Sequence, residues 1–494
     1  MQVLILILAG SVLTFLSFPN WNFDFLAWIC LVPIFLATHN LPFKKSFFVG
    51  WSSGTLSFIA ILYWIVPTFK AAGLNPIFGL LTLSLLASYI GLYYAFYFAL
   101  TGHFLKNLSE FRSLLFCSTL WISLEQIRNY CLTGFPWGLL GYSQWQKPSF
   151  IQIAEFTGVY GVSFLIVFFN ALIFLWIKNK RIGYFSALFF LSLFSTNFFI
   201  LSLKKNSIPK NTKHFSVVLL QGNIDQYKKW DSAFINEILN TYKNLTESAS
   251  QNSQLMIWPE TSAPGWIPND AWLMERLKQI ISPTKTFHLI GAVTNQNKNY
   301  NSAFLFNPKG EILARVDKSH LVPFGEFVPM HDFLEKWIKV LNQLGGFDTG
   351  KETNLLKLGE FPLGISICYE AIFPNLIRQQ TLKGAEVLIN ITNDGWYLRT
   401  AALPQHFSMN IFRAIENRRT LIRCANTGIS GVIKPSGVIS KKSEPNKQEI
   451  LEDVVDLSSQ ITFYTRVGDL FAWLCNFASL LTIFIYKKNR CSTH

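Results

Sequence analysis

The sequence is poor in charged residues, and this shortage excludes most classes of soluble protein. Asp, Glu, Lys and Arg together make up 15% of the 494 residues, whereas hydrophobic residues make up 50%. An average soluble domain has about 25% charged residues. A chain with so much apolar material is not disordered, and its composition indicates an integral membrane protein.

Patterned cysteine and histidine motifs are also missing. The 7 cysteines are odd in number, irregularly spaced and free of any CxxC pair, which argues against a disulfide framework or a thiolate zinc site. No HExxH sequence is present either, and the histidines lack the spacing of metal ligands. We therefore expect neither a metal nor a cofactor.

Positive charge exceeds negative charge, with a formal net charge of +14. The basic residues gather in short clusters between apolar runs, at 44–45, 178–181 and 487–490. This distribution is typical of the positive-inside bias of membrane proteins rather than of a continuous nucleic-acid surface. It predicts a lipid bilayer as a partner and no nucleic acid.

Apolar runs that approach the roughly 20 residues needed to cross a bilayer occur at both ends of the chain. They cover residues 2–18, 23–37, 46–69, 76–105, 113–127, 159–177, 183–203 and 467–486. Eight spans would place the basic loops and both termini in the cytoplasm. The sequence therefore predicts a membrane domain of seven helices over 1–204, an outer domain over 205–466, and a C-terminal membrane helix with a cytoplasmic tail over 467–494.

The hydropathy pattern of the sequence changes between residues 213 and 466. Short β-rich runs such as 215–221, 254–258 and 363–368 alternate with amphipathic stretches such as 233–250 and 405–418. Strands that alternate with helices, several of them continuously apolar, indicate an α/β domain covered by helices.

Polar residues stand where the predicted strands of this domain end. Glu260 follows LMIWP, Lys318 follows ARVD, Cys368 ends LGISI, and Asn393–Asp394 end VLINI. Strand ends are where α/β folds place their sites. A thiolate is a nucleophile, a carboxylate can take its proton, and a lysine can stabilise an oxyanion. Singly, each residue also fits a structural role: a buried structural cysteine, a surface lysine, and a helix-capping or salt-bridged glutamate.

Several motifs occur together in one order. They are W-P-E at 258–260, D-K-x-H-L-V-P-F-G-E at 317–326, and I-C-Y-E at 367–370. They resemble the Glu–Lys–Cys triad motifs of the nitrilase superfamily. Together with Q-G-N-I at 221–224, K-W-D at 229–231 and T-G-F-P-W at 133–137, on a chain with many N-terminal spans, they resemble the apolipoprotein N-acyltransferase family.

This resemblance implies an α-helical membrane domain of about eight spans and a periplasmic, nitrilase-like α-β-β-α sandwich in the bacterial inner membrane. The implied reaction moves an acyl chain from a phospholipid to the N-terminal amine of a diacylglyceryl-cysteine apolipoprotein, through a cysteine acyl-thioester. The implied catalytic residues are the general base Glu260, the oxyanion-stabilising Lys318 and the nucleophile Cys368. The implied supporting and substrate-binding residues are Trp230, Glu326, Tyr369 and Glu370.

Three other interpretations remain open at this point. The same triad would serve a membrane-anchored amidase that uses water as its second nucleophile. Cys368 could instead pair with His406 in a papain-like dyad. A transporter or scaffold would use intramembrane charges such as Glu125 and Arg128. The chain also departs from the family pattern at 398–407, and Gly345–Gly346 suggests a mobile lid.

Overall fold

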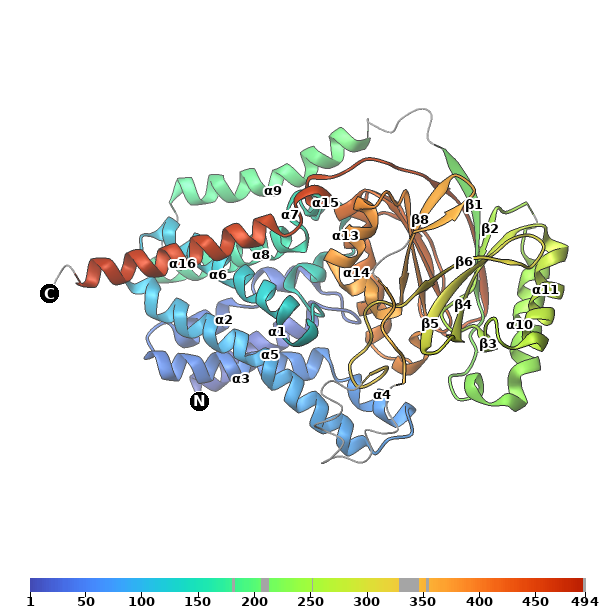
Figure 1. The fold of residues 1–494 in the computed structure, drawn as a ribbon. Coiled ribbons are helices and arrows are strands. Elements are labelled where there is room, and N and C mark those ends of the chain that lie inside the picture. Colours follow the sequence, from blue (N-terminus) through green and yellow to red (C-terminus); the bar gives the residue numbers. More distant parts are fainter. Residues whose placement is uncertain (180–182, 206–212, 251, 328–345, 352–354, 492–494) are drawn as a thin grey trace. The chain divides into compact units, whose positions relative to one another are not determined.

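The computed structural model describes the whole chain except residues 180–182, 206–212, 251, 328–345, 352–354 and 492–494 (Figure 1). Gly345 of the suggested lid lies outside the described residues. The chain forms two compact units. The helical unit comprises Met1–Ser207, Tyr397–Phe412 and Thr462–His494, and the sheet unit comprises Ile208–Trp396 and Arg413–Ile461.

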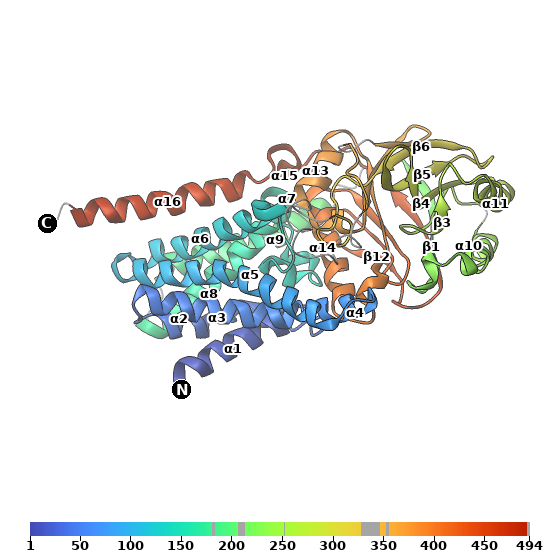
Figure 2. The ribbon, with the colours of Figure 1, turned by 60° about the horizontal axis from the view of Figure 1, so that its bottom comes forward.

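Helices form at every apolar run that the sequence singles out. The helical unit contains α1 (Gln2–Leu16), α2 (Val32–Thr38), α3 (Phe43–Ile61), α4 (Ile65–Ala71), α5 (Pro76–Phe104), α6 (Glu110–Tyr130), α7 (Ala154–Thr157), α8 (Val159–Asn179), α9 (Tyr184–Lys205), α15 (Phe463–Val467) and α16 (Leu470–Cys491) (Figure 2). The run at 23–37 differs from the expected single helix, because a 3₁₀ turn at Asp24–Trp28 precedes α2. The predicted helical character of the N-terminal region is confirmed.

Length and hydropathy alone single out fewer spans than the eight predicted. Among the described residues, Pro76–Asn107 and Val159–Lys178 are long and apolar enough to cross a membrane, and the pair α3–α4, bent by 43°, would make a third. Shorter apolar helical stretches of 10–17 described residues lie at Gln2–Leu16, Asp24–Thr38, Ser186–Ile200 and Leu470–Tyr486. Helix α6 carries four charged residues within its length, at positions 110, 112, 125 and 128.

Small residues let α3 and α5 pack closely. A Cβ atom on Gly50 of α3 would come within 2.6 Å of the main-chain oxygen of Tyr94 in α5. One on Gly91 of α5 would come within 2.9 Å of the main-chain oxygen of Trp51 in α3. Glycines at such contacts allow helix backbones to approach each other, a device that is common between membrane helices.

The sheet unit contains two sheets. The seven-stranded sheet has the order β13-β1-β2-β4-β5-β6, with β3 paired to β4, and the six-stranded sheet has the order β12-β11-β10-β9-β8-β7. The strands of the first are β1 (His214–Gln221), β2 (Leu255–Ile257), β3 (Ala263–Trp266), β4 (Phe287–Asn295), β5 (Asn299–Phe306), β6 (Ile312–Asp317) and β13 (Glu449–Asp456). Those of the second are β7 (Leu356–Leu358), β8 (Phe361–Ile367), β9 (Val387–Thr392), β10 (Thr420–Ala425), β11 (Gly431–Ile433) and β12 (Ile439–Lys442).

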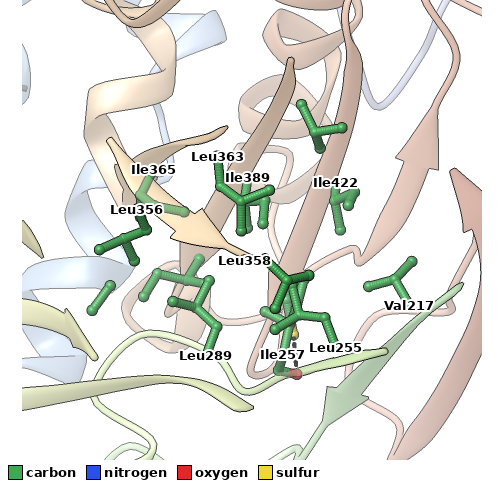
Figure 3. Close-up of a cluster of buried hydrophobic side chains, with 14 of the residues drawn as sticks. Val217, Leu255, Ile257, Leu289, Leu356, Leu358, Leu363, Ile365, Ile389 and Ile422 are labelled. Carbon is green, nitrogen blue, oxygen red and sulfur yellow. Dashed lines mark hydrogen bonds between the residues drawn. The ribbon is translucent and has the colours of Figure 1, made fainter. Parts of the chain in front are cut away.

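The two sheets enclose an apolar core and are covered by helices on their outer faces. The sequence of β1 is continuously apolar because both faces of the strand are buried. Val217 joins the core between the sheets (Figure 3), and Leu219 belongs to the same core. Val218 and Leu220 instead pack toward α10 (Ile235–Ser248) and α11 (Ala271–Ile281). Because α13 (Pro374–Leu382) packs against β8 through the hydrogen bond from Gln380 to the Ile365 oxygen, the layers form the predicted α-β-β-α sandwich.

Candidate active site

The ends of three strands bring the predicted triad residues together. Glu260 follows β2, Lys318 directly follows β6, and Cys368 directly follows β8. All three are buried, with exposed fractions of 5%, 1% and 9%. The ammonium of Lys318 lies 3.5 Å from Oε1 of Glu260. These residues are distant in sequence and meet only because both sheets end at this place.

Lys318 is held between two carboxylates. Its ammonium lies 2.8 Å from Oε1 of Glu326, which is closer than Glu260. Burial alone would lower the pKa of Lys318, but Glu326 and Glu260 outweigh that effect and raise its pKa above the ordinary value. The lysine is therefore a permanent positive charge at neutral pH. A fixed cation in a water-poor site is suited to stabilise negative charge that develops during a reaction.

The Glu260 carboxylate is oriented by donors on both of its oxygens. Oε1 accepts a hydrogen bond from the Asn301 side chain at 2.7 Å, and Oε2 accepts one from the main-chain N–H of Asn393 at 2.7 Å. The Asn301 amide also donates to Glu326 at 3.1 Å. Because carboxylates only accept, the NH₂ group of Asn301 must face both acids. The amide thus connects the two carboxylates that surround Lys318.

Cys368 occupies a strained position between β8 and a short 3₁₀ helix, Cys368–Ile372. Its φ of 55° lies in the left-handed region, which costs a non-glycine residue about 1 kcal/mol or more. Burial raises the pKa of its thiol above the ordinary value, Glu260 adds to that effect, and Lys318 opposes it. The cysteine thus rests as a thiol. A helix N-terminus beside a thiol lowers the thiol pKa, but α13 begins only at Pro374, so deprotonation of Cys368 needs a base.

Glu370 connects the cysteine turn to the loop after Lys318. One of its carboxylate oxygens accepts hydrogen bonds from the main-chain N–H groups of Ser319 and His320 and from the Ser319 hydroxyl, at 2.6–3.0 Å. The other oxygen accepts one from the Ile367 N–H at 2.7 Å. Burial raises the pKa of Glu370 despite these donors. All of these contacts are internal, so the carboxylate holds two loops together.

The remaining predicted residues fall beside the triad or outside the described side chains. The Tyr369 ring lies near His320 and Phe373, with centroid distances of 6.1 and 5.1 Å. Burial raises the pKa of Tyr369, and the positive charge of Lys318 opposes that effect. Trp230 ends the 3₁₀ helix Lys228–Trp230, and its side chain lies outside the described part of the structure.

A second buried lysine was not predicted. Lys229 is 3% exposed, and its ammonium donates to the main-chain oxygen of Glu260 at 2.8 Å. Burial lowers its pKa to about 7, although Glu260 and Cys368 oppose that shift. Its neighbour Lys228 is exposed and pairs with Glu237. The sequence does not indicate which of the two adjacent lysines is buried. It also does not distinguish Asn301 from the other polar residues of its strand.

The divergent segment after Asn393–Asp394 belongs to the helical unit. There the Gln405 side chain accepts hydrogen bonds from the indoles of Trp64 and Trp137 and donates to the main-chain oxygens of Pro19 and Ile61. His406 packs against the rings of Trp137 and Tyr397. Within the sheet unit, the charged groups that act on Cys368 are acids and lysines.

Among the residues that the structure describes, no group of three His, Cys, Asp or Glu side chains could hold an ion. The chemistry of the cluster is that of a thiol, a base and a fixed cation.

Comparison with known proteins gives matches along nearly the whole chain. The model of the apolipoprotein N-acyltransferase N-terminal domain matches residues 10–172, and that of carbon-nitrogen hydrolase matches residues 217–462. Among solved structures, an amidase from Nesterenkonia sp. aligns with a TM-score of 0.40 at 19% identity, over 54% of this chain and 97% of the amidase.

Curated relatives extend over both units. Apolipoprotein N-acyltransferase from Geobacter metallireducens is 37% identical over 493 residues, which cover 96% of this chain and 92% of the relative. Apolipoprotein N-acyltransferase 1 from Treponema denticola is 30% identical over 97% of this chain and 95% of its own length. The chain therefore belongs to the apolipoprotein N-acyltransferase family, as an acyltransferase with a carbon-nitrogen hydrolase domain.

Proposed function

We propose that this acyltransferase works by two half-reactions through an acyl-thioester on Cys368. The observation that carries the proposal is the resting thiol of Cys368 beside the oriented carboxylate of Glu260 and the fixed charge of Lys318. A buried thiol with a raised pKa needs an adjacent base to become a nucleophile. The alternative base, His406, packs among aromatic rings of the helical unit.

In the first half-reaction, Glu260 takes the thiol proton while the sulfur attacks the ester carbonyl of a phospholipid. The resulting oxyanion is stabilised by Lys318 and by the main-chain N–H of Tyr369. The carbon–oxygen bond then breaks, and the leaving alkoxide takes the proton from Glu260 as a lysophospholipid. Glu326 supports the reaction by fixing Lys318 at 2.8 Å.

In the second half-reaction, the N-terminal amine of a diacylglyceryl-cysteine apolipoprotein attacks the thioester. Glu260 takes a proton from the attacking nitrogen and returns it to the departing sulfur, so that an amide forms and the thiol is restored. Ping-pong kinetics follow from this order. Trp230, Tyr369 and Glu370 complete the surroundings of the acyl group, with Glu370 acting through the loops that it holds.

The proposal includes a placement in the cell. The chain crosses the bacterial inner membrane eight times, with a membrane domain over 1–204, a periplasmic catalytic domain over 205–466 and a C-terminal span over 467–494. The apolar helices and the basic loops between them support this placement. Labelling of single cysteines from each membrane face tests it, and labelling near Asn252 from the cytoplasm would contradict it.

Intact-protein mass spectrometry after incubation with phospholipid vesicles and no acceptor tests the chemistry. We expect a mass gain of one acyl chain that hydroxylamine removes and that Cys368→Ala lacks. Glu260→Gln should abolish the adduct, whereas His406→Ala should leave it; the reverse pattern would favour a cysteine–histidine dyad. A folded protein that takes up no acyl group from phospholipid, yet hydrolyses small amides, would overturn the proposal in favour of an amidase.

A further inference from the structure

The peptide group between Cys368 and Tyr369 joins the nucleophile to the proposed oxyanion donor. Its N–H belongs to Tyr369, the second residue of the 3₁₀ helix Cys368–Ile372, and a helix has no internal acceptor for the N–H groups of its first turn. Its C=O belongs to Cys368. This peptide is trans, and in a planar trans peptide the C=O and the N–H point in opposite directions. A contact that holds the Cys368 oxygen therefore also fixes the direction of the Tyr369 N–H.

Asn390 of β9 makes such a contact with the Cys368 oxygen. Its side chain has no exposed surface, and its Nδ2 donates to the main-chain oxygens of Cys368 and Ser366, each at 3.2 Å. Because carbonyl oxygens only accept, the NH₂ group of the amide must face them. The side chain of Asn390 thus holds the peptide that directly follows β8 from the neighbouring strand.

Arg423 fixes the orientation of the Asn390 amide. The two residues stand opposite each other in the parallel register of β9 and β10. Ile389 and Ile391 face the core between the sheets, so Asn390 lies on the other face of its strand. The guanidinium of Arg423 donates to Oδ1 of Asn390 and, at 2.8 Å, to Asp394. A guanidinium has only donors, so the amide cannot turn around without placing its NH₂ group against another donor.

We propose that Asn390 is a positioning residue, which aims the Tyr369 N–H at the oxyanion by holding the Cys368 carbonyl from the opposite side. Arg423 and Asp394 keep its amide in place. Hydrogen bonds in a chain polarise one another, so the chain from guanidinium through amide to peptide also makes the Tyr369 N–H a stronger donor. No proton is transferred along this chain, and Asn390 acts only through the peptide that it holds.

This inference rests on the proposed role of Cys368 as the nucleophile, and its test compares two reactions of the same sulfur. In acylation by p-nitrophenyl butyrate, the sulfur attacks the ester carbonyl, a tetrahedral oxyanion forms, and p-nitrophenolate leaves. In alkylation by iodoacetamide, the sulfur displaces iodide from a saturated carbon, and no oxyanion forms. Both reactions need the thiolate. The ratio of the two rates, each measured at Cys368 by peptide mass spectrometry on the full chain, therefore reports the stabilisation of the oxyanion.

Asn390→Leu removes the donor and keeps a similar shape. We expect acylation to slow about 100-fold, at the lower end of the loss expected for one oxyanion donor, because the N–H is misdirected rather than removed. Alkylation should keep the wild-type rate. The matched control is Gln380→Leu, which removes another buried amide that donates to a main-chain oxygen of β8, that of Ile365. It should keep the wild-type ratio, whereas Glu260→Gln, which removes the base, should slow both reactions.

A wild-type ratio in a folded Asn390→Leu protein would overturn the proposal, whether both rates are unchanged or both fall together. The second pattern would show that Asn390 only supports the fold around the cysteine. If Asn390→Leu is recovered unfolded, Asn390→Asp is read in the same way, because a carboxylate still accepts from Arg423 but has no proton to donate to the Cys368 oxygen.

The wild-type protein separates this inference from the proposed function. A wild type that p-nitrophenyl butyrate acylates at Cys368 but phospholipid does not would overturn the proposed function, and the ratio in Asn390→Leu would still decide the role of Asn390. A wild type that neither ester acylates at Cys368 would overturn both.

Discussion

Replacement of Asn301 by leucine should slow acylation of Cys368 while the protein stays folded. Asn301 is 2% exposed and donates to both Glu260 and Glu326. Leucine has a similar shape and no donor. Without the amide, the Glu260 carboxylate keeps only the Asn393 N–H and the more distant Lys318 as donors. It can then rotate away from the position in which a base must lie, within about 3 Å of its proton.

The expected magnitude follows from the two bonds that are lost. A hydrogen bond to a charged group contributes about 1.5–3 kcal/mol, and about 1.4 kcal/mol corresponds to a factor of ten. If the loss of one bond is expressed in the rate, acylation slows about tenfold. If both are expressed, it slows about 100-fold or more. We therefore expect Asn301→Leu to acylate about 10- to 100-fold more slowly than the wild type.

The assay is the rate of thioester formation on phospholipid vesicles, followed by quenched intact-protein mass spectrometry. Asn299→Leu is the matched control, because Asn299 lies on the same face of β5 two residues away and its side chain contacts only Asn295 among the hydrogen bonds of the described residues. The control should retain the wild-type rate. An Asn301→Leu protein that is folded and acylates within twofold of the wild type would refute the role given to this amide.

Three further outcomes are expected. Burial lowers the pKa of Lys229 to about 7, so between about pH 7 and 10 the unfolded chain binds more protons than the folded protein, and the free energy of unfolding rises with pH. Lys229→Met should flatten this rise in detergent melting curves, whereas Lys228→Met should leave it unchanged. Glu370→Gln should lower the unfolding free energy by about 2 kcal/mol or more, because an amide cannot accept all four hydrogen bonds, and an unchanged melting temperature would contradict this. Gln405→Leu should lower the melting temperature by several degrees, since it leaves the Trp64 and Trp137 indoles without their acceptor; equal melting would refute it.

The sequence predicts the parts of the site that depend on local pattern. Glu260, Lys318 and Cys368 each follow an apolar run, and strand ends are local features of a sequence. Asn301 could not be predicted, because its position depends on the pairing of β5 with β4 and β6. Glu370 stands in the motif that the sequence singles out, but the direction of its carboxylate depends on a loop about 50 residues away in the chain.

In the helical unit, too, the sequence predicts local features but not those that depend on distant contacts. Apolar runs predict where its helices lie, because hydropathy is a sum over neighbouring residues. They do not predict that the run at 23–37 breaks into a 3₁₀ turn and a short helix. Nor do they predict that residues 397–412 belong with these helices, which depends on the contacts of Gln405 with Trp64 and Trp137.

The position of β13 has a consequence for the biogenesis of the protein. This strand is the last of the sheet unit, and it pairs along its whole length with β1, the first, from His214 opposite Asp456 to Gln221 opposite Glu449. Until residue 456 has been synthesised, β1 has an open edge, which is a template for aggregation. Pairing between such distant segments also makes folding slow. The sheet that carries Glu260 is therefore completed only after nearly the whole chain has left the ribosome, so a truncated product would have no finished site.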